Sequence, residues 1–235
     1  MNYAKLPKNI EETCYMYKFF SLLMLIYVSL FALQIKQTPI EFGEKRVELT
    51  KEYIQSHYNL AVEDIKIVPK IVVVHHTAID DYSDSLSRFK SQTLPTDRPD
   101  IKNGGSLNVS THFMIERDGT IHQLMPLNYM ARHVIGLNYN SIGIENVGGE
   151  NSKDNLTQAQ LKSNIELIKE LKKEFPTIKY VIGHYEYKCF EGSDLWLELD
   201  ESYRTFKDDP SKRFMKEIRK KIRGFKEAPC TQGHK

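Results

Sequence analysis

Three of the eight histidines in this chain lie at an end of a predicted apolar strand, where they could carry chemistry. They are His75, His112 and His184. Active-site residues of α/β proteins commonly lie at strand ends. Two such histidines and a carboxylate would make an open catalytic zinc site with water as the fourth ligand. A hydrogen-bonded structural role for each histidine is the alternative. The chain has no local His-Glu-x-x-His pair, so the spacing alone leaves both interpretations open.

The strands that would position these histidines are predicted from short apolar runs. Residues 71–74 form an unbroken β-branched run ending at His75-His76, which is typical of a buried strand. Residues 112–116 and 120–125 are joined by Arg117-Asp118-Gly119, and Asp-Gly between apolar runs indicates a hairpin. Further strands are expected at residues 141–147 and 180–183.

Helices are expected between and after these strands. Thr157 is expected to cap a helix whose apolar residues recur at spacings of three and four up to Phe175. The last helix is expected to begin at Asp209-Pro210, with proline in its first turn. Thr50 is expected to cap a short helix that runs from Lys51 to Tyr58. Residues 80–107 are expected to form a surface loop with one short helix. This alternation predicts an α/β (α+β) single domain, with a central mixed β-sheet flanked by helices.

The N-terminal residues differ in composition from the rest. Residues 19–35 carry no charge and lie between Lys18 and Lys36, which indicates an N-terminal hydrophobic helix. As a helix this run would span roughly 25 Å, just short of a typical hydrocarbon core. A membrane anchor is favoured over a cleaved signal, because Leu30-Phe31-Ala32 is a poor cleavage site. The expected organisation is an anchor or signal segment (1–36), a spacer (37–69), the domain (70–225) and a C-terminal tail (226–235).

The overall composition restricts the class of partner. A net charge of +2 argues against a strongly polyanionic partner, and no segment resembles a nucleic-acid-binding module, so no nucleic acid is expected. Hydrophobic residues make up 40%, enough for a core. Three cysteines are too few for a disulfide framework but allow one bridge, and a Cys189–Cys230 pair stays open.

Six motifs in a fixed order resemble the N-acetylmuramoyl-L-alanine amidase family, which includes amidase-type phage lysozymes and peptidoglycan-recognition proteins. The motifs are IVVVHHTA (71–78), THFMIERDGTIHQL (111–124), ARHVIG (131–136), SIGIENVG (141–148), YVIGH (180–184) and KDDP (207–210). The resemblance implies a zinc hydrolase of the amide between N-acetylmuramic acid and L-alanine, in peptidoglycan or its fragments.

Carried over residue by residue, the resemblance makes His75, His184 and Asp209 the ligands of Zn²⁺. It makes Glu145 catalytic, as the group that shuttles a proton from water to the leaving nitrogen. It gives Lys207 the role of stabilising the oxyanion.

Several of these assignments have alternatives. His76 would point away from the site, because successive strand residues face opposite sides. Asp209 follows His184 after an insertion at residues 190–205, and Ser211 replaces the family's glycine. Asp209 as a simple helix cap and Cys189 as the ligand are the rival interpretations. Glu145 could instead pair with a lysine on an edge strand.

Polar residues between the hairpin and the Glu145 strand complete the expected site. Arg132, His133 and Asn138 are predicted to contact the muropeptide, which carries amide and carboxylate groups; loop hydrogen bonding is the alternative. His112 is expected to support the site without touching the metal. Other functions consistent with the sequence are a peptidoglycan-binding protein without activity and a zinc peptidase acting on the stem peptide. The expected location is the bacterial cell envelope, either membrane-anchored with the catalytic domain outside the cytoplasm or exported.

Overall fold

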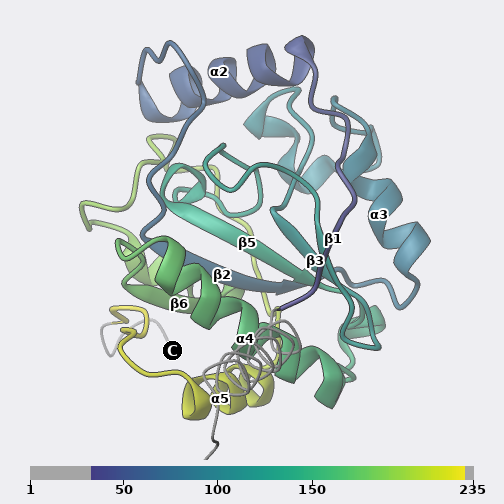
Figure 1. The fold of residues 1–235 in the computed structure, drawn as a ribbon. Coiled ribbons are helices and arrows are strands. Elements are labelled where there is room, and N and C mark those ends of the chain that lie inside the picture. Colours follow the sequence, from purple (N-terminus) through teal and green to yellow (C-terminus); the bar gives the residue numbers. More distant parts are fainter. Residues whose placement is uncertain (1–32, 231–235) are drawn as a thin grey trace, which may run out of the picture. The chain divides into compact units, whose positions relative to one another are not determined.

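A six-stranded mixed sheet organises the residues that the computed structural model describes, which are 33–230 (Figure 1). The strand order is β1–β4–β3–β5–β2–β6. The neighbours β3–β5, β5–β2, β2–β6 and β1–β4 are parallel, and only β3–β4 is antiparallel. The strands are β1 Ile35–Gln37, β2 Ile71–His76, β3 Phe113–Ile115, β4 Ile121–Gln123, β5 Ser141–Asn146 and β6 Tyr180–Gly183. The predicted mixed sheet is confirmed, and so is the hairpin over Asp118-Gly119.

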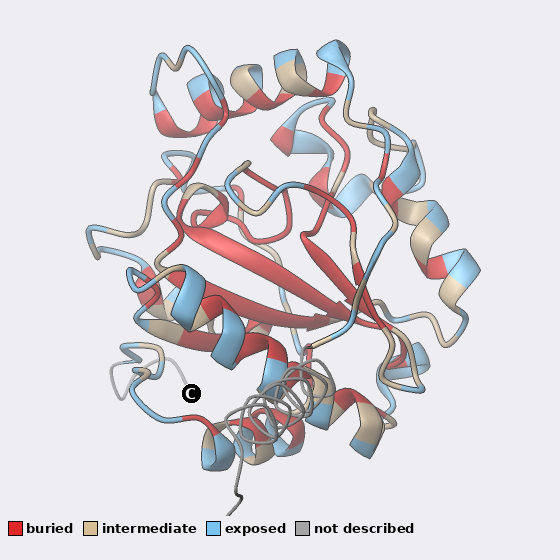
Figure 2. Ribbon diagram, in the orientation of Figure 1, coloured by how far each residue is buried: buried red, intermediate tan, exposed pale blue. Residues whose placement is uncertain are grey.

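Helices α4 (Gln158–Glu174) and α5 (Lys212–Lys221) cover one face of the sheet (Figure 1). On this face Asn164 of α4 donates to Asn146 of β5 at 2.7 Å, and Met215 of α5 lies against Gly183. The central strands are buried along their length, as Figure 2 shows. Because residues alternate along a strand, His76 belongs to this face and His75 to the opposite one.

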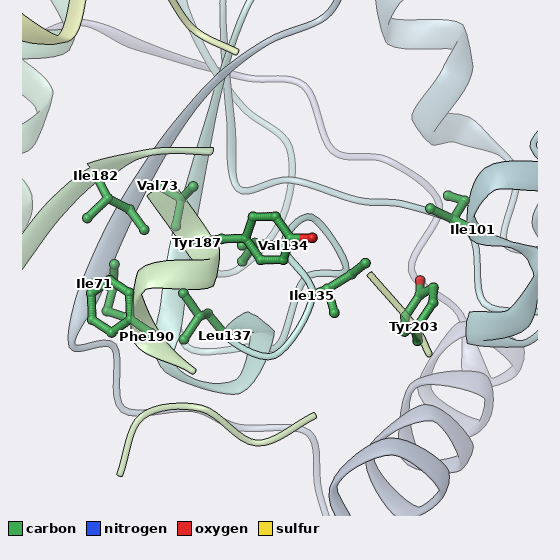
Figure 3. Close-up of a cluster of buried hydrophobic side chains, with 10 residues drawn as sticks. All are labelled: Ile71, Val73, Ile101, Val134, Ile135, Leu137, Ile182, Tyr187, Phe190 and Tyr203. Carbon is green, nitrogen blue, oxygen red and sulfur yellow. The ribbon is translucent and has the colours of Figure 1, made fainter. Parts of the chain in front are cut away.

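The opposite face is covered by irregular segments and short 3-10 turns. Ile71, Val73 and Ile182 of the sheet pack there in a cluster (Figure 3). The partners in this cluster are Ile101, Val134, Ile135, Leu137, Tyr187, Phe190 and Tyr203. His75 follows Val73 on the same face of β2, so this apolar cluster supports the first candidate functional side chain.

The helix ends agree with the sequence in one case and differ in another. Thr157 caps α4 as predicted, and its hydroxyl accepts from the N–H of Gln160 at 3.1 Å. Helix α5 was expected to begin at Asp209-Pro210. It begins instead at Lys212, because the Ser211 hydroxyl accepts from the Phe214 N–H at 3.2 Å. The short helix expected within residues 80–107 is α3, Tyr82–Lys90.

Residues 37–69, expected as a spacer, belong to the same compact unit as the sheet, which begins at Ile35. They contain α2, Glu44–Tyr58. The expectation that Thr50 caps this helix is wrong, since the Thr50 hydroxyl donates to the Arg46 carbonyl inside it at 2.7 Å. Buried Tyr53, Ile54 and Tyr58 of α2 pack against Ile65, Leu107 and Met130.

The predicted anchor lies almost wholly outside the described residues. Ile35 and Lys36, assigned to it by composition, pair in β1 with Ile121 and His122 of β4. Among residues 33–230, no helix is long and apolar enough to cross a bilayer.

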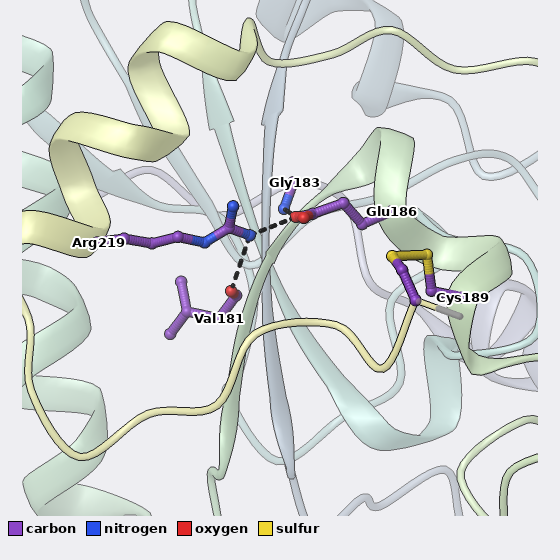
Figure 4. Close-up of a disulfide and its surroundings, with 6 residues drawn as sticks. Val181, Gly183, Glu186, Cys189 and Arg219 are labelled. Atoms are coloured by element: carbon purple, nitrogen blue, oxygen red, sulfur yellow. Dashed lines mark hydrogen bonds and ion pairs between the residues drawn. A yellow bond between two sulfur atoms is a disulfide. The ribbon is translucent and has the colours of Figure 1, made fainter. Parts of the chain in front are cut away.

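A disulfide joins Cys189 to Cys230 (Figure 4). It attaches the C-terminal segment to the 3-10 helix His184–Phe190 that follows β6. Nearby, Arg219 of α5 donates to Glu186, which also accepts from the Gly183 N–H at 2.8 Å. Both links hold the segment that carries His184.

Candidate metal centre and catalytic cleft

His75, His184 and Asp209 converge on one point. The Nδ1 atoms of the two histidines are 3.0 Å apart, and Asp209 places Oδ2 3.3 Å from His75 Nδ1 and Oδ1 3.1 Å from His184 Nδ1. All three residues are buried, and one ligand atom from each lies within 4.8 Å of the others. Two imidazoles and a carboxylate facing one point are the donor set of an open zinc site, so these residues fit a divalent metal ion.

Neighbouring elements bring the three residues together. His75 lies near the end of β2, and His184 directly follows β6, which is parallel to β2. Asp209 is held by its own carbonyl, which accepts from the Tyr185 N–H at 3.0 Å. Because Ser211 caps α5, the Asp209 carboxylate has no capping role and faces the histidines. Cys189, the rival ligand, is bonded to Cys230 and has no thiolate to offer.

A chain of hydrogen bonds orients His75. The Ser141 hydroxyl donates to the Leu137 carbonyl at 2.8 Å, so it accepts from His133 Nε2–H at 3.1 Å. His133 Nδ1, 3.0 Å from His75 Nε2, must then accept from His75. This leaves the His75 Nδ1 lone pair directed at the candidate metal position, the usual arrangement of a metal-binding histidine. Burial lowers the pKa of both His75 and His133, which keeps the rings neutral.

Glu145 lies beside His75, its register partner on β5. It is only 8% exposed, and its Oε2 is buried without a hydrogen-bond partner among the described residues. Burial raises the pKa of Glu145 to about 7; His75 opposes this shift and Asp209 adds to it. A carboxyl group with a pKa near neutrality can both take up and release a proton at physiological pH.

Asp209 shows the opposite behaviour. Burial alone would raise the pKa of its carboxyl, but the contact with the imidazole of His184 holds this pKa well below the ordinary value. The pKa of one carboxyl group of the site is therefore raised and that of the other is lowered, a separation that suits acid–base chemistry.

A cavity lies over these groups. Its lining includes Glu145, Lys207, Arg98, Ile79 and Phe206 together with the three candidate ligands. Lys207 is half-buried, and its charge acts on both Glu145 and His184. The structure therefore brings together all five residues expected to bind metal or to act in catalysis.

The three residues expected to contact substrate also line the cavity, but their polar atoms are engaged within the protein. Arg132 donates to the carbonyls of Ile101, Gly105 and Leu107 and to the Tyr203 hydroxyl. Asn138 accepts from the N–H groups of His133 and Val134. A substrate contact by Arg132, His133 or Asn138 therefore stays a prediction.

His112 supports the site from behind. It is fully buried, its Nδ1 accepts from the Gly143 N–H at 3.1 Å, and its Nε2 donates to the Tyr129 carbonyl at 2.9 Å. Burial lowers the pKa of His112 to about 4, so the ring is neutral, and its hydrogen bond to Gly143 supports β5.

Sequence reasoning did not assign Ser141, Arg98 or Phe206 to the site. Ser141 shares strand parity with Glu145, which is the signal that places it on the site face. Arg98 and Phe206 lie in irregular segments whose path no local pattern predicts.

Comparison with known proteins gives consistent matches. The family described as N-acetylmuramoyl-L-alanine amidase matches residues 66–212. The endolysin of Klebsiella phage KP32 is 34% identical over 108 residues, which cover 43% of this chain and 71% of that protein. The endolysin of Escherichia phage T7 is 41% identical over 66 residues, which cover 26% of this chain and 44% of that one. Among solved structures, the N-acetylmuramoyl-L-alanine amidase LysC from Clostridium intestinale URNW is similar at a TM-score of 0.47 and 19% identity, covering 80% of this chain and 99% of that one.

Proposed function

The chain belongs to the N-acetylmuramoyl-L-alanine amidase family, and from this premise we infer that it hydrolyses the amide between N-acetylmuramic acid and L-alanine in peptidoglycan, using zinc held by His75, His184 and Asp209. The observation that carries the inference is three converging metal donors beside the buried carboxyl group of Glu145, whose Oε2 has no hydrogen-bond partner among residues 33–230.

Each residue has a part that follows from its position. A zinc ion, when bound, polarises the amide carbonyl and lowers the pKa of water to about 7. Glu145 accepts a proton from the attacking water and delivers it to the alanine nitrogen as the carbon–nitrogen bond breaks. Lys207 stabilises the negative charge that develops on the carbonyl oxygen. Ser141 and His133 keep the His75 ring in the required tautomer.

The test is digestion of purified muropeptides by the full chain, with products identified by mass spectrometry and zinc quantified in each sample. We expect wild type to release intact stem peptides. Glu145→Gln should keep zinc and lose about 10²–10⁴-fold in rate. Asp209→Ala should lose both zinc and activity, while Asp194→Ala, which removes an exposed carboxylate that does not line the cavity, is the matched control. Cleavage within the stem peptide would indicate a peptidase, and zinc-free binding without cleavage would indicate a recognition protein.

We further propose that the uncharged residues before β1, 19–34, anchor the protein to a membrane or export it, so that the domain works at the cell wall. Their lack of charge supports this, and the Cys189–Cys230 bridge is typical of compartments outside the cytoplasm. The protein should remain with membranes after alkaline extraction, and recovery in the soluble fraction with an unprocessed N-terminus would contradict both forms of the proposal.

A further inference from the structure

Phe206 is the most exposed large hydrophobic side chain among residues 33–230, at 87% exposed. It lies three residues before Asp209 and lines the same cavity as Lys207 and Glu145. A lone apolar side chain on a surface needs no explanation in itself. An aromatic ring that lines a catalytic cavity does need an explanation, because a bound substrate would displace water from the ring and contact it.

The backbone around Phe206 is fixed on both sides. Before it, the Thr205 N–H donates to the Tyr187 hydroxyl at 2.9 Å, and that hydroxyl donates to the Thr205 carbonyl at 2.6 Å. After it, the Asp209 carbonyl accepts from the Tyr185 N–H at 3.0 Å. Tyr187 is itself 1% exposed and belongs to the core cluster in Figure 3. The Phe206 ring is therefore presented to solvent from a fixed backbone, which lowers the entropy lost when a ligand packs on it.

We propose that Phe206 is a stacking platform for a pyranose ring of the glycan, a proposal that rests on the amidase function above. The scissile amide joins two chemically different parts of the substrate, a glycan and a short stem peptide. A pyranose ring presents a face of C–H groups, which suits the electron-rich face of an aromatic ring. The stem peptide is a flexible chain without a ring, so it has no comparable flat face of C–H groups. Phe206 thus selects for substrates that keep the sugar next to the scissile bond.

The experiment compares two substrates that share the scissile amide and the stem peptide. One carries the disaccharide N-acetylglucosaminyl-N-acetylmuramic acid, and the other carries only the D-lactoyl group in place of the sugar. Steady-state kinetics are measured for wild type, Phe206→Ala, Phe206→Trp and Leu199→Ala. Leu199 is the matched control, because it is a large hydrophobic residue that is 61% exposed, lies seven residues before Phe206 and does not line the cavity.

We expect Phe206→Ala to lower the ratio of kcat/KM for the sugar substrate over the sugar-free one by about 2–13-fold, the loss of one aromatic stacking contact. The loss should appear in KM, Phe206→Trp should restore the ratio, and Leu199→Ala should leave it unchanged. An unchanged ratio in Phe206→Ala would overturn the proposal, and so would an equal loss on both substrates.

Binding of the sugar substrate, measured by calorimetry in the Glu145→Gln background with and without Phe206→Ala, separates this proposal from the amidase function. If wild type cleaves neither substrate, the amidase function fails. Weaker binding in the Phe206→Ala variant would still support the platform, and equal binding would refute it.

Discussion

Replacing Glu145 by glutamine should make the metal-free protein more stable at alkaline pH. The same substitution should remove most of the activity of the zinc-loaded protein. Burial raises the pKa of this carboxyl from 4.5 to about 7. Between these two values the native state holds a proton that the unfolded chain has released. The free energy of unfolding therefore decreases as the pH rises through this window.

The magnitude follows from the same two values. A difference of one pKa unit corresponds to 1.36 kcal/mol. Between pH 5 and pH 8 the buried carboxyl should lower the free energy of unfolding by about 2–3 kcal/mol. Glutamine has nearly the same shape and no charge, so the variant should gain about that amount on wild type as the pH is raised over this range.

The assay is urea denaturation of both proteins with chelator present, at pH 5 and at pH 8. Taking the difference between the two pH values cancels any effect of the substitution on packing that does not depend on pH. Glu150→Gln, at an exposed position, is the control and should show no such difference. If the Glu145→Gln variant gained nothing between pH 5 and pH 8, the carboxyl would not be desolvated and its role as a proton carrier with a raised pKa would be refuted.

Three other perturbations test the site and its supports. Asp209→Asn should weaken zinc binding by more than the roughly 10–100-fold that is typical of groups outside the ligand set, and Ser141→Ala should weaken it by about 10-fold. Zinc affinity is measured by chelator competition, and wild-type affinity in either variant would contradict the role assigned to that residue. Arg46→Met should lower the free energy of unfolding by about 2–4 kcal/mol, because buried Arg46 donates to the carbonyls of Glu41, Phe89 and Ser91, and urea denaturation would show this. Cys189→Ser removes a disulfide between residues 41 apart and should lower the free energy of unfolding by up to about 4 kcal/mol. In thermal melts, the reduced wild type should match the variant, and an unchanged Tm would refute the contribution of the disulfide.

The strands and their faces could be predicted because they depend on local alternation. The run before His75 predicts a buried strand, and period-two alternation separates His75 from His76. The hairpin at Asp118-Gly119 and the Thr157 cap are likewise encoded within a few residues. Each of these features needs only short-range sequence information.

Most of the features that could not be predicted depend on contacts between distant segments, and Thr50 is the local exception. Thr50 is a residue type that often caps helices. Because α2 begins earlier, at Glu44, the Thr50 hydroxyl donates to the Arg46 carbonyl and caps nothing. Asp209 and Ser211 are both good caps, and the choice between them is made by the histidines that face Asp209. The donors of Arg132 could be matched to loop carbonyls only once the path of residues 98–107 was known.

The contacts of α2 determine how far this enzyme can be shortened. Asn138 donates its amide to the hydroxyls of Tyr53 and Tyr58, and His57 is hydrogen-bonded at 2.9 Å to Glu198, whose side chain is fully buried. The three α2 residues all precede residue 66, where the family match begins. A protein trimmed to the family match would lose the His57 partner of the Glu198 carboxylate and both hydroxyl partners of the Asn138 amide, each loss costing about 1–3 kcal/mol. Recombinant versions intended for activity should therefore start before β1 and not at the edge of the recognisable domain.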